Sequence, residues 1–198
     1  MIKKPYSEYL ALRKNGKVIE ADGFGDKVLL LEDSTYLKLF RRKNCISSAA
    51  LFPYAKRFAV NAQKLEALNI PCPKIISVFH VTDIKRDIVH YQALPGLTLR
   101  QLHQGKADYP DDLLQQFVAF VQHIHSVGIF FRSMHLGNVV LTPDGKIGLI
   151  DIADLKVQRK PLSKAQVKRN LRHIMRYPED AAWLANIDFE QQIMQQYA

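Results

Sequence analysis

The spacing of apolar residues divides the chain into a strand-rich first half and a helix-rich second half. In the first half, short runs of β-branched and aromatic residues alternate with turns rich in Asp, Gly and Ser, which is the pattern of antiparallel strands. One longer stretch repeats its apolar residues every three or four positions, as an amphipathic helix does. The pattern therefore predicts strands over 17–21, 27–32, 35–40, 74–81 and 88–94, and one main helix over 49–68.

The second half begins near Pro95 and Gly96, where the strand pattern stops. A helix is predicted over 111–128, because acidic residues stand in its first turn and Gly128 stands at its end. Its apolar stripe consists of Leu114, Phe117, Val121 and Ile124.

Two further segments near the end of the chain also read as helical. Ser163 is followed three residues later by Gln166, and this capping box predicts a helix over 163–177. A last amphipathic segment carries Trp183, Leu184, Ile187 and Ile193. We therefore predict an α+β chain with two lobes: residues 1–95 form a small antiparallel sheet of five strands with one main helix, and residues 96–198 form a reduced helical lobe.

The composition is that of an ordinary globular protein with an excess of positive charge. Apolar residues make up 47% and charged residues 24% of 198 positions, and no apolar run has the length of a membrane span. The first sixteen residues lack the apolar core of a secretory signal. Cys45 and Cys72 have no disulfide-framework or zinc-site spacing, so we expect a cytoplasmic protein. The net charge of +9 predicts an anionic partner.

Candidate chemistry lies in the stretch FRSMHLGNVVLT, residues 131–142, and in PDGKIGLIDIAD, which follows it directly. Asn138 begins one apolar run and Asp151 ends the next, with a Pro-Asp-Gly turn between them. Antiparallel strands joined by such a turn bring these two residues to the same end of a hairpin. A carboxamide and a carboxylate oxygen there suit Mg²⁺ that bridges nucleotide phosphates. The alternative is that both side chains only cap backbone groups.

This stretch resembles the catalytic segment of the protein-kinase-like superfamily. Residues 131–138 fall on the pattern H-R-D-L-x-x-x-N, in which Arg132 and Asn138 match and Ser133 replaces the Asp. Asp151 falls on the first position of D-F-G, and the thirteen-residue step from Asn138 is the spacing of the family. The resemblance extends over about residues 18–177.

Within the superfamily, the chain looks closest to bacterial lipopolysaccharide kinases that act on Kdo or heptose, and to the toluene-tolerance protein group. His135, the sequence LIDIADL and the basic segment after it carry this likeness. It implies a two-lobed kinase-like fold and an ATP- and Mg²⁺-dependent phosphotransferase. Its acceptor would be an alcohol group of a lipopolysaccharide core sugar or of another phosphorylated glycolipid.

The resemblance also implies roles for individual residues. Asn138 and Asp151 would bind the metal, and Arg132 would organise the loop. His135 is a hypothetical substitute for the missing base, and Asp154 could also face the cleft. Lys38, at the end of a Tyr-Leu-Lys run similar to V-A-I-K, would contact the α- and β-phosphates. The remaining nucleotide contacts would come from a glycine loop at Gly23 and Gly25 and from the backbone of a hinge at Tyr91 to Leu94.

Two departures from the family pattern leave an alternative open. Ser133 is too weak a base at neutral pH, and the helix residue that should pair with Lys38 falls near Phe58 or Asn61, with Glu66 only at the helix end. The alternative is a pseudokinase that binds nucleotide but transfers little or no phosphate. A third interpretation is a peripheral membrane protein that binds no nucleotide.

The predicted helix 163–177 has a basic stripe, formed by Lys164, Lys168, Arg172 and Arg176. Its simplest interpretation is a solvated face, and the sharper one is a docking surface for a phosphorylated glycolipid or an anionic membrane. The second would place the protein at the inner face of a membrane. Nucleic acid is not an expected partner, because no nucleic-acid motif accompanies the charge.

Overall fold

The computed structural model describes residues 1–41 and 52–197 and is an α+β protein. The chain divides into two compact units. Unit 1 comprises Met1–Glu66 and Cys72–Ala93, and unit 2 comprises Ala67–Pro71 and Leu94–Ala198. Among the described residues, unit 1 contains one sheet, and unit 2 contains two smaller ones.

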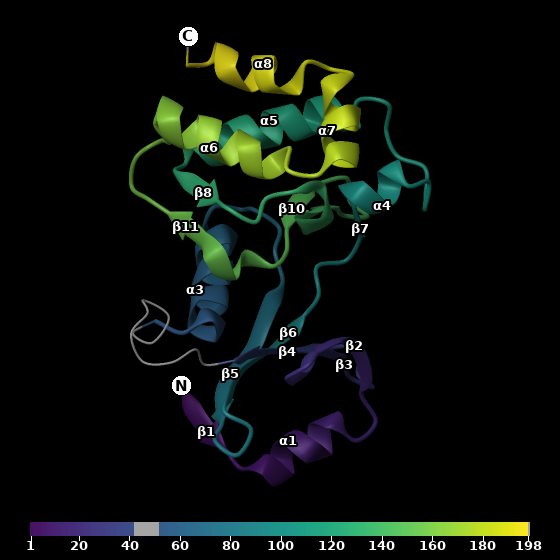
Figure 1. The fold of residues 1–198 in the computed structure, drawn as a ribbon, viewed down its shortest axis with the longest axis vertical. Coiled ribbons are helices and arrows are strands. Elements are labelled where there is room, and N and C mark those ends of the chain that lie inside the picture. Colours follow the sequence, from purple (N-terminus) through teal and green to yellow (C-terminus); the bar gives the residue numbers. More distant parts are fainter. Residues whose placement is uncertain (42–51, 198) are drawn as a thin grey trace. The chain divides into compact units, whose positions relative to one another are not determined.

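Unit 1 is built on a sheet with the strand order β1-β5-β6-β4-β3-β2 (Figure 1). The described strands are β1 (Ile2–Lys4), β2 (Lys17–Asp22), β3 (Gly25–Leu30), β4 (Tyr36–Arg41), β5 (Lys74–Val81) and β6 (Arg86–Gln92). The prediction of a purely antiparallel, five-stranded sheet is wrong, because β1 adds a sixth strand parallel to β5. A strand of only three residues, two of them lysines, carries no alternating apolar pattern and is held by pairing with β5.

The two faces of this sheet are covered by different helices. On one face, α1 (Tyr6–Arg13) contributes Tyr9 to a core with Leu29, Leu37, Phe79 and Ile88. The sequence did not predict α1, because Tyr9 is its one fully buried residue and the helix has no continuous apolar stripe.

The opposite face carries α3 (Tyr54–Ala67), which confirms the predicted main helix over its described part, whereas residues 49–51 lie outside the described residues. Phe58 of α3 packs on Tyr91 of β6 with ring centroids 5.5 Å apart, and on Phe40 of β4 at 6.3 Å. The side chains of β4 that alternate with its buried leucines therefore face α3.

Unit 2 contains two small antiparallel sheets. One has the order β10-β9-β7 and consists of β7 (Leu97–Thr98), β9 (Val139–Leu141) and β10 (Ile147–Leu149). The other pairs β8 (Ile129–Phe131) with β11 (Leu155–Val157). Two short 3₁₀ turns, η1 (Leu136–Asn138) and η2 (Ile152–Asp154), connect them.

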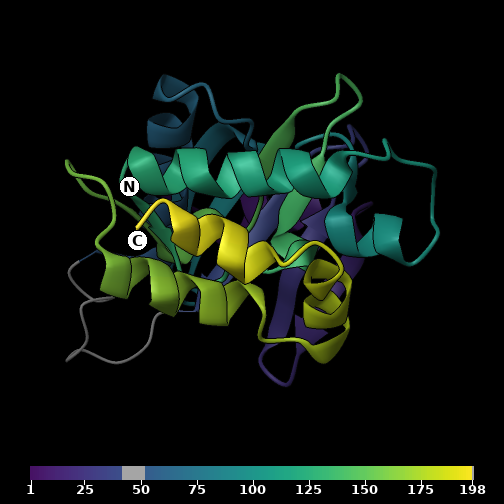
Figure 2. The ribbon, with the colours of Figure 1, turned by 90° about the horizontal axis from the view of Figure 1, so that it is seen from above.

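Five described helices surround these strands: α4 (Leu99–His103), α5 (Leu113–Ser126), α6 (Lys164–Ile174), α7 (Pro178–Ala185) and α8 (Phe189–Gln195). Helix α8 lies along both α5 and α6 (Figure 2), and its Phe189 stacks on Phe117 of α5 at 5.2 Å. The predicted helix at 111–128 is confirmed, although Leu113 rather than Leu114 is fully buried. Among the helices of the described residues, none has both the length and the apolar character needed to span a membrane.

The capping box predicted at the start of α6 is present. Ser163 Oγ accepts a hydrogen bond from the Gln166 backbone N–H at 3.4 Å, and Gln166 Oε1 accepts one from the Ser163 N–H at 2.9 Å. We expect Ser163→Ala to lower the free energy of unfolding by about 1 kcal/mol, measured by urea denaturation. Ser163→Asp keeps a capping oxygen and should retain most of the stability. Equal losses in the two variants would contradict the capping role.

Candidate functional site

The hairpin of β9 and β10 brings Asn138 and Asp151 to the same end of one ladder. Val139 pairs with Leu149, and one step further the Ile150 N–H donates to the Asn138 carbonyl at 3.0 Å. Asp151 follows directly. At the opposite end, Thr142 Oγ1 donates to Asp144 Oδ1 at 2.6 Å and closes the turn. The predicted proximity of the Asn138 and Asp151 backbones is therefore present.

Asp151 adopts an unusual backbone conformation. Its φ of 52° and ψ of 44° lie in the left-handed region, and the residue begins the turn η2. This conformation costs a non-glycine residue about 1 kcal/mol or more, although Asp tolerates it better than most residues. The side chain of Asp151 is exposed, while Ile152 and Ala153 after it are buried. The left-handed residue therefore turns the chain so that apolar side chains enter the core beside an exposed carboxylate.

The carboxamide of Asn138 is oriented by the loop that precedes it. Asn138 is 9% exposed, and its Nδ2 donates to the Ser133 carbonyl at 2.8 Å. Because a carbonyl can only accept, this bond identifies the amide nitrogen and leaves Oδ1 as the acceptor atom. The carboxamide is thus held by its nitrogen, and its oxygen is not used in this bond. The backbone of Asn138 is bonded to Ile150, the residue before Asp151.

A partly buried ion pair between α4 and α7 supports the same loop. Arg100 of α4 donates to Asp180 of α7 through Nε at 3.0 Å and through Nη2 at 2.6 Å. Asp180 Oδ2 also accepts the backbone N–H of Leu136 in η1 at 3.2 Å. The hydrogen bonds with Asp180 raise the pKa of the Arg100 guanidinium. No local sequence pattern indicates this pair, because its members are 80 residues apart.

A second buried contact supports the start of the loop. Asn170 of α6 donates through Nδ2 to the Phe131 carbonyl at 2.7 Å, and its Oδ1 contacts His125 Nε2 at 2.8 Å. Both side chains are fully buried, and burial lowers the pKa of His125. The neutral ring donates through Nε2, since the Asn170 oxygen is an acceptor. The loop is thus connected to α5 and α6 as well as to α7.

Ser133, which occupies the position of the missing Asp, contacts another carboxylate. Its hydroxyl donates to Asp154 Oδ2 at 2.7 Å, and Arg132 Nε lies 3.9 Å from the same oxygen. Asp154 is the last residue of η2, so this turn brings an aspartate to the loop residue Ser133 across 21 positions of sequence. Two neighbouring loop residues, Arg132 and Ser133, therefore both face the same carboxylate oxygen of η2.

His135 has the geometry of a capping residue. Its Nδ1 accepts the Gly137 backbone N–H at 3.2 Å, and its ring meets Tyr177 edge-on at 5.1 Å. Burial, followed by the charges of Arg100 and Arg176, lowers the pKa of His135, so the ring is neutral at neutral pH. The proton of the neutral ring is then on Nε2.

In unit 1, Lys38 lies on the α3 face of the sheet. It is opposite Val28 and Val89, and its Nζ is 5.9 Å from the centre of the Phe40 ring. Helix α3 buries no acidic side chain; its buried residues are Ala55, Phe58, Asn61, Ala62 and Leu65. Glu66 of the same helix is exposed. The acidic residue that the kinase pattern expects on this helix is therefore also missing from the buried face of α3.

Gly23 and Gly25 form the tight turn between β2 and β3. Gly25 has a φ of 108°, and a side chain added at either glycine would meet open space. The Phe24 N–H donates to Asp22 Oδ1 at 2.8 Å, and the Arg86 guanidinium donates to the Phe24 carbonyl at 2.5 Å. Both the backbone N–H and the carbonyl of Phe24 are thus hydrogen-bonded to side chains of unit 1.

The predicted hinge residues fall in different units. Tyr91 belongs to β6 of unit 1, where it is paired with Tyr36 of β4, and the two rings stack at 5.7 Å. Leu94 belongs to unit 2, where its side chain packs over Gly148 of β10. A β-carbon at Gly148 would lie 2.5 Å from the Pro71 carbonyl, so this glycine permits close packing of the hairpin.

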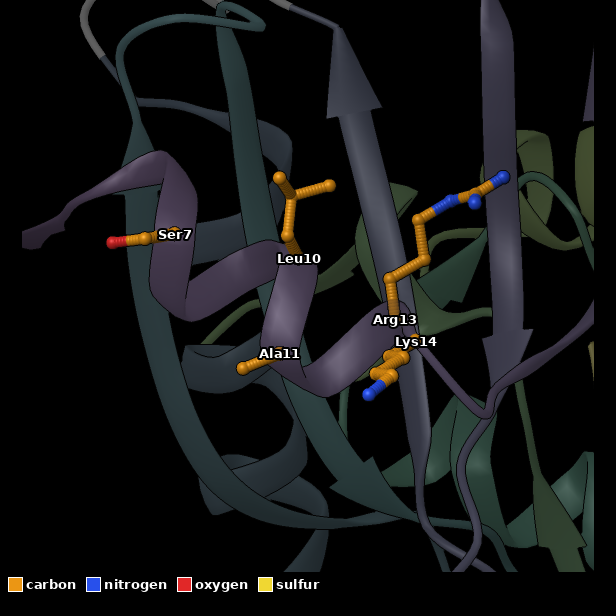
Figure 3. Close-up of a pocket in the computed structure, with 5 residues that line it drawn as sticks. All are labelled: Ser7, Leu10, Ala11, Arg13 and Lys14. Carbon is orange, nitrogen blue, oxygen red and sulfur yellow. The ribbon is translucent and has the colours of Figure 1, made fainter.

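A surface hollow of about 420 Å³ is formed by α1 alone (Figure 3). Its lining residues are Ser7, Leu10, Ala11, Arg13 and Lys14. The Arg13 side chain extends away from the helix and forms an ion pair with Asp26 of β3 at 2.5 Å. Because no catalytic set of side chains converges on this hollow, the hairpin of unit 2 is the stronger candidate site.

The metal-binding capacity of the hairpin is modest. Within residues 1–41 and 52–197, no three His, Cys, Asp or Glu side chains gather as a metal site. Asn138 and Asp151 offer one carboxamide and one carboxylate, which fits an ion that keeps water and phosphate oxygens as its other ligands. This donor set suits Mg²⁺ better than zinc.

No protein-family model matches the sequence, and no curated protein matches it either. A functional proposal for this chain therefore depends on its own residues and on their geometry.

Proposed function

We propose that this chain is a kinase-like phosphotransferase that uses Mg²⁺-ATP and acts on an alcohol group of an anionic acceptor. The observation that carries the proposal is the arrangement of Asn138 and Asp151. The two residues bracket the end of one β-ladder, and Asp151 adopts a left-handed conformation that leaves its carboxylate exposed. Functional sites often retain strained residues of this kind.

In this proposal, the side-chain oxygens of Asn138 and Asp151 hold the metal. Bound there, Mg²⁺ would neutralise charge on the transferred phosphate. The Asn138 oxygen is oriented by the bond of its nitrogen to the Ser133 carbonyl. The loop itself is held by Asp180 at Leu136 and by Asn170 at Phe131. These buried bonds serve catalysis because positioning accounts for much of the rate of phosphoryl transfer.

The remaining nucleotide contacts follow from the resemblance of the sequence to the kinase-like superfamily. Lys38 would contact the α- and β-phosphates, Gly23 and Gly25 would lie over them, and the backbone at Tyr91 and Leu94 would meet the adenine. The half-buried position of Lys38 on the α3 face of the sheet supports its part of this assignment.

An anionic acceptor is supported by the basic side chains near His173 of α6. Burial, and then the charges of Arg176, Arg169 and Arg132, lowers the pKa of His173. The basic side chains of α6 are exposed, while Val167, Leu171 and Ile174 are buried. A phosphorylated sugar of the lipopolysaccharide core, or a related glycolipid, fits such a surface. The same helix would meet an anionic membrane at its inner face.

Binding of Mg²⁺-ATP is the first test of this proposal. A ligand at a hundred times its Kd stabilises a protein by about 2.7 kcal/mol, which a thermal melt detects. We expect Asp151→Asn and Asn138→Ala to lose most of the Mg²⁺-dependent part of the shift, and EDTA to remove the same part from the wild type. Asp144→Asn, in the turn at the other end of the hairpin, is the matched control.

Transfer of the terminal phosphate to core oligosaccharide is the second test. Labelled product from the wild type supports the phosphotransferase. A thermal shift with neither product nor ADP would identify a nucleotide-binding module without turnover, as expected for a pseudokinase. A wild type whose melting temperature does not respond to Mg²⁺-ATP would contradict both functions.

A further inference from the structure

The carboxylate of Asp154 is hydrogen-bonded to the hydroxyl of Ser133. Ser133 Oγ donates to Asp154 Oδ2 at 2.7 Å, which is a short bond to a charged acceptor. The side chain of Asp154 is 17% exposed, and its Oδ1 is buried without a hydrogen-bond donor among the described residues. The carboxylate therefore contacts Ser133 and Arg132, which are neighbouring residues of the loop, and both Ser133 and Asp154 are partly exposed.

We propose that Ser133 and Asp154 together replace the missing catalytic aspartate, with Ser133 as the group that touches the acceptor. This inference rests on the proposed phosphotransferase function. As the acceptor oxygen forms its bond to the terminal phosphorus, the bond from that phosphorus to the bridging oxygen of ADP breaks. The acceptor hydroxyl gives its proton to Ser133 Oγ, and Ser133 gives its own proton to Asp154 Oδ2. The proton later leaves Asp154 for solvent.

The position of the carboxylate in the chain explains why the loop can contain a serine. The pattern H-R-D places the aspartate on the loop itself, whereas here the loop contributes a hydroxyl and η2 contributes the charge. Arg132 Nε lies 3.9 Å from the same carboxylate oxygen, so a positive charge faces Asp154 from the loop. In this proposal, the carboxylate of Asp154 supplies the negative charge of the missing aspartate, and Ser133 lies between it and the acceptor.

The geometry of His135 makes it a weaker candidate for this role. Its Nδ1 lone pair accepts the Gly137 N–H, and in the neutral ring Nε2 carries the proton. Neither nitrogen then offers an available lone pair. Ser133, by contrast, has an oxygen with acceptor capacity and a proton already directed to a carboxylate.

A purely structural bond between Ser133 and Asp154 is the main alternative, and the variant Asp154→Asn separates the two. Asparagine keeps an oxygen that accepts the Ser133 hydroxyl, so the link between η2 and the loop survives. It cannot take up a proton. A structural role therefore tolerates Asp154→Asn, and a relay does not.

The experiment measures ADP formation from Mg²⁺-ATP with water as the acceptor, alongside the thermal shift that Mg²⁺-ATP produces. We expect Asp154→Asn and Ser133→Ala to lower kcat by about 10²-fold, while KM for ATP and the thermal shift stay at the wild-type values. The exchange variant Ser133→Asp with Asp154→Ser returns a carboxylate to the loop and should recover at least tenfold of that loss. Asp111→Asn, an exposed aspartate of unit 2, is the control for loss of one negative charge.

Three outcomes would overturn the relay, and a fourth would contradict the proposed function. An unchanged kcat in Asp154→Asn overturns the relay and leaves the phosphotransferase intact. A wild type that is stabilised by Mg²⁺-ATP but forms no ADP also overturns the relay. Loss of the thermal shift in Asp154→Asn would assign the residue to nucleotide binding and would overturn the relay as well. Absence of a shift in the wild type contradicts the proposed function itself.

Discussion

Replacing Asp180 by alanine should lower the free energy of unfolding by about 3 kcal/mol, because it removes a buried carboxylate that accepts three hydrogen bonds. Asp180 is 1% exposed, and both of its oxygens bind the Arg100 guanidinium. Without it, the Arg100 guanidinium, whose side chain is 27% exposed, keeps its charge but loses both of these hydrogen bonds. The backbone N–H of Leu136, which Asp180 Oδ2 also accepts, loses its partner.

Urea denaturation of the whole chain measures this loss, with Glu179→Gln as the matched control. Glu179 is the neighbouring acid in the first turn of α7 and is exposed. Its replacement should cost about 0.5 kcal/mol or less, since the main effect is on the helix dipole. If Asp180→Ala and Glu179→Gln lowered the free energy of unfolding equally, the hydrogen bonds of Asp180 would contribute nothing to stability.

The same variant has a functional consequence under the proposed function. Leu136 begins the turn η1, which ends at Asn138. Because η1 is then no longer attached to α7, we expect the Mg²⁺-dependent thermal shift of Asp180→Ala to fall along with its stability. Asp180→Asn keeps an acceptor for the Leu136 N–H but not the charge. Its shift should lie between those of the alanine variant and the wild type.

Gly96→Ala should be at least as destabilising, at about 3 to 5 kcal/mol, because two costs combine at this position. Gly96 has a φ of 126°, which L-residues rarely adopt. A β-carbon there would also lie 2.1 Å from the Leu141 carbonyl oxygen of β9. That oxygen belongs to the backbone of a paired strand and cannot move without disturbing the β7–β9 ladder.

Gly105→Ala is the control that separates backbone strain from the steric clash. Gly105 also has a positive φ, of 75°, but a β-carbon there would meet nothing within 4 Å. It should therefore cost only about 1 kcal/mol, the price of left-handed backbone in a residue with a side chain. Thermal or urea unfolding of both variants provides the comparison. A Gly96→Ala protein as stable as Gly105→Ala would contradict the clash.

Much of the candidate site could be predicted because its parts are close in the sequence. A Pro-Asp-Gly turn between two apolar runs specifies a hairpin, and a hairpin brings the residues at its two outer ends together. Asn138 and Asp151 follow from that local rule. The helices at 111–128 and 163–177 were predictable for the same reason, since apolar spacing and a capping box are also local signals.

Contacts across long stretches of chain could not be predicted in this way. The strand β1 was missed because its three residues are held by pairing with β5, more than seventy positions away. The pairing of Asp180 with Arg100 depends on where α4 and α7 pack. His135 was the expected substitute base, and Asp154 was expected only as a residue that could also face the cleft. The structure gives His135 Nδ1 a backbone hydrogen bond and brings Asp154 to Ser133.

By itself, the sequence determined the α+β class, the hairpin with its two oxygen-bearing residues and the basic face of α6, because turn chemistry and apolar periodicity act over a few residues. The tertiary structure alone decided what the loop rests on and which carboxylate faces Ser133. Those contacts depend on the packing of distant elements, in which a buried polar group must find a partner wherever the fold places one.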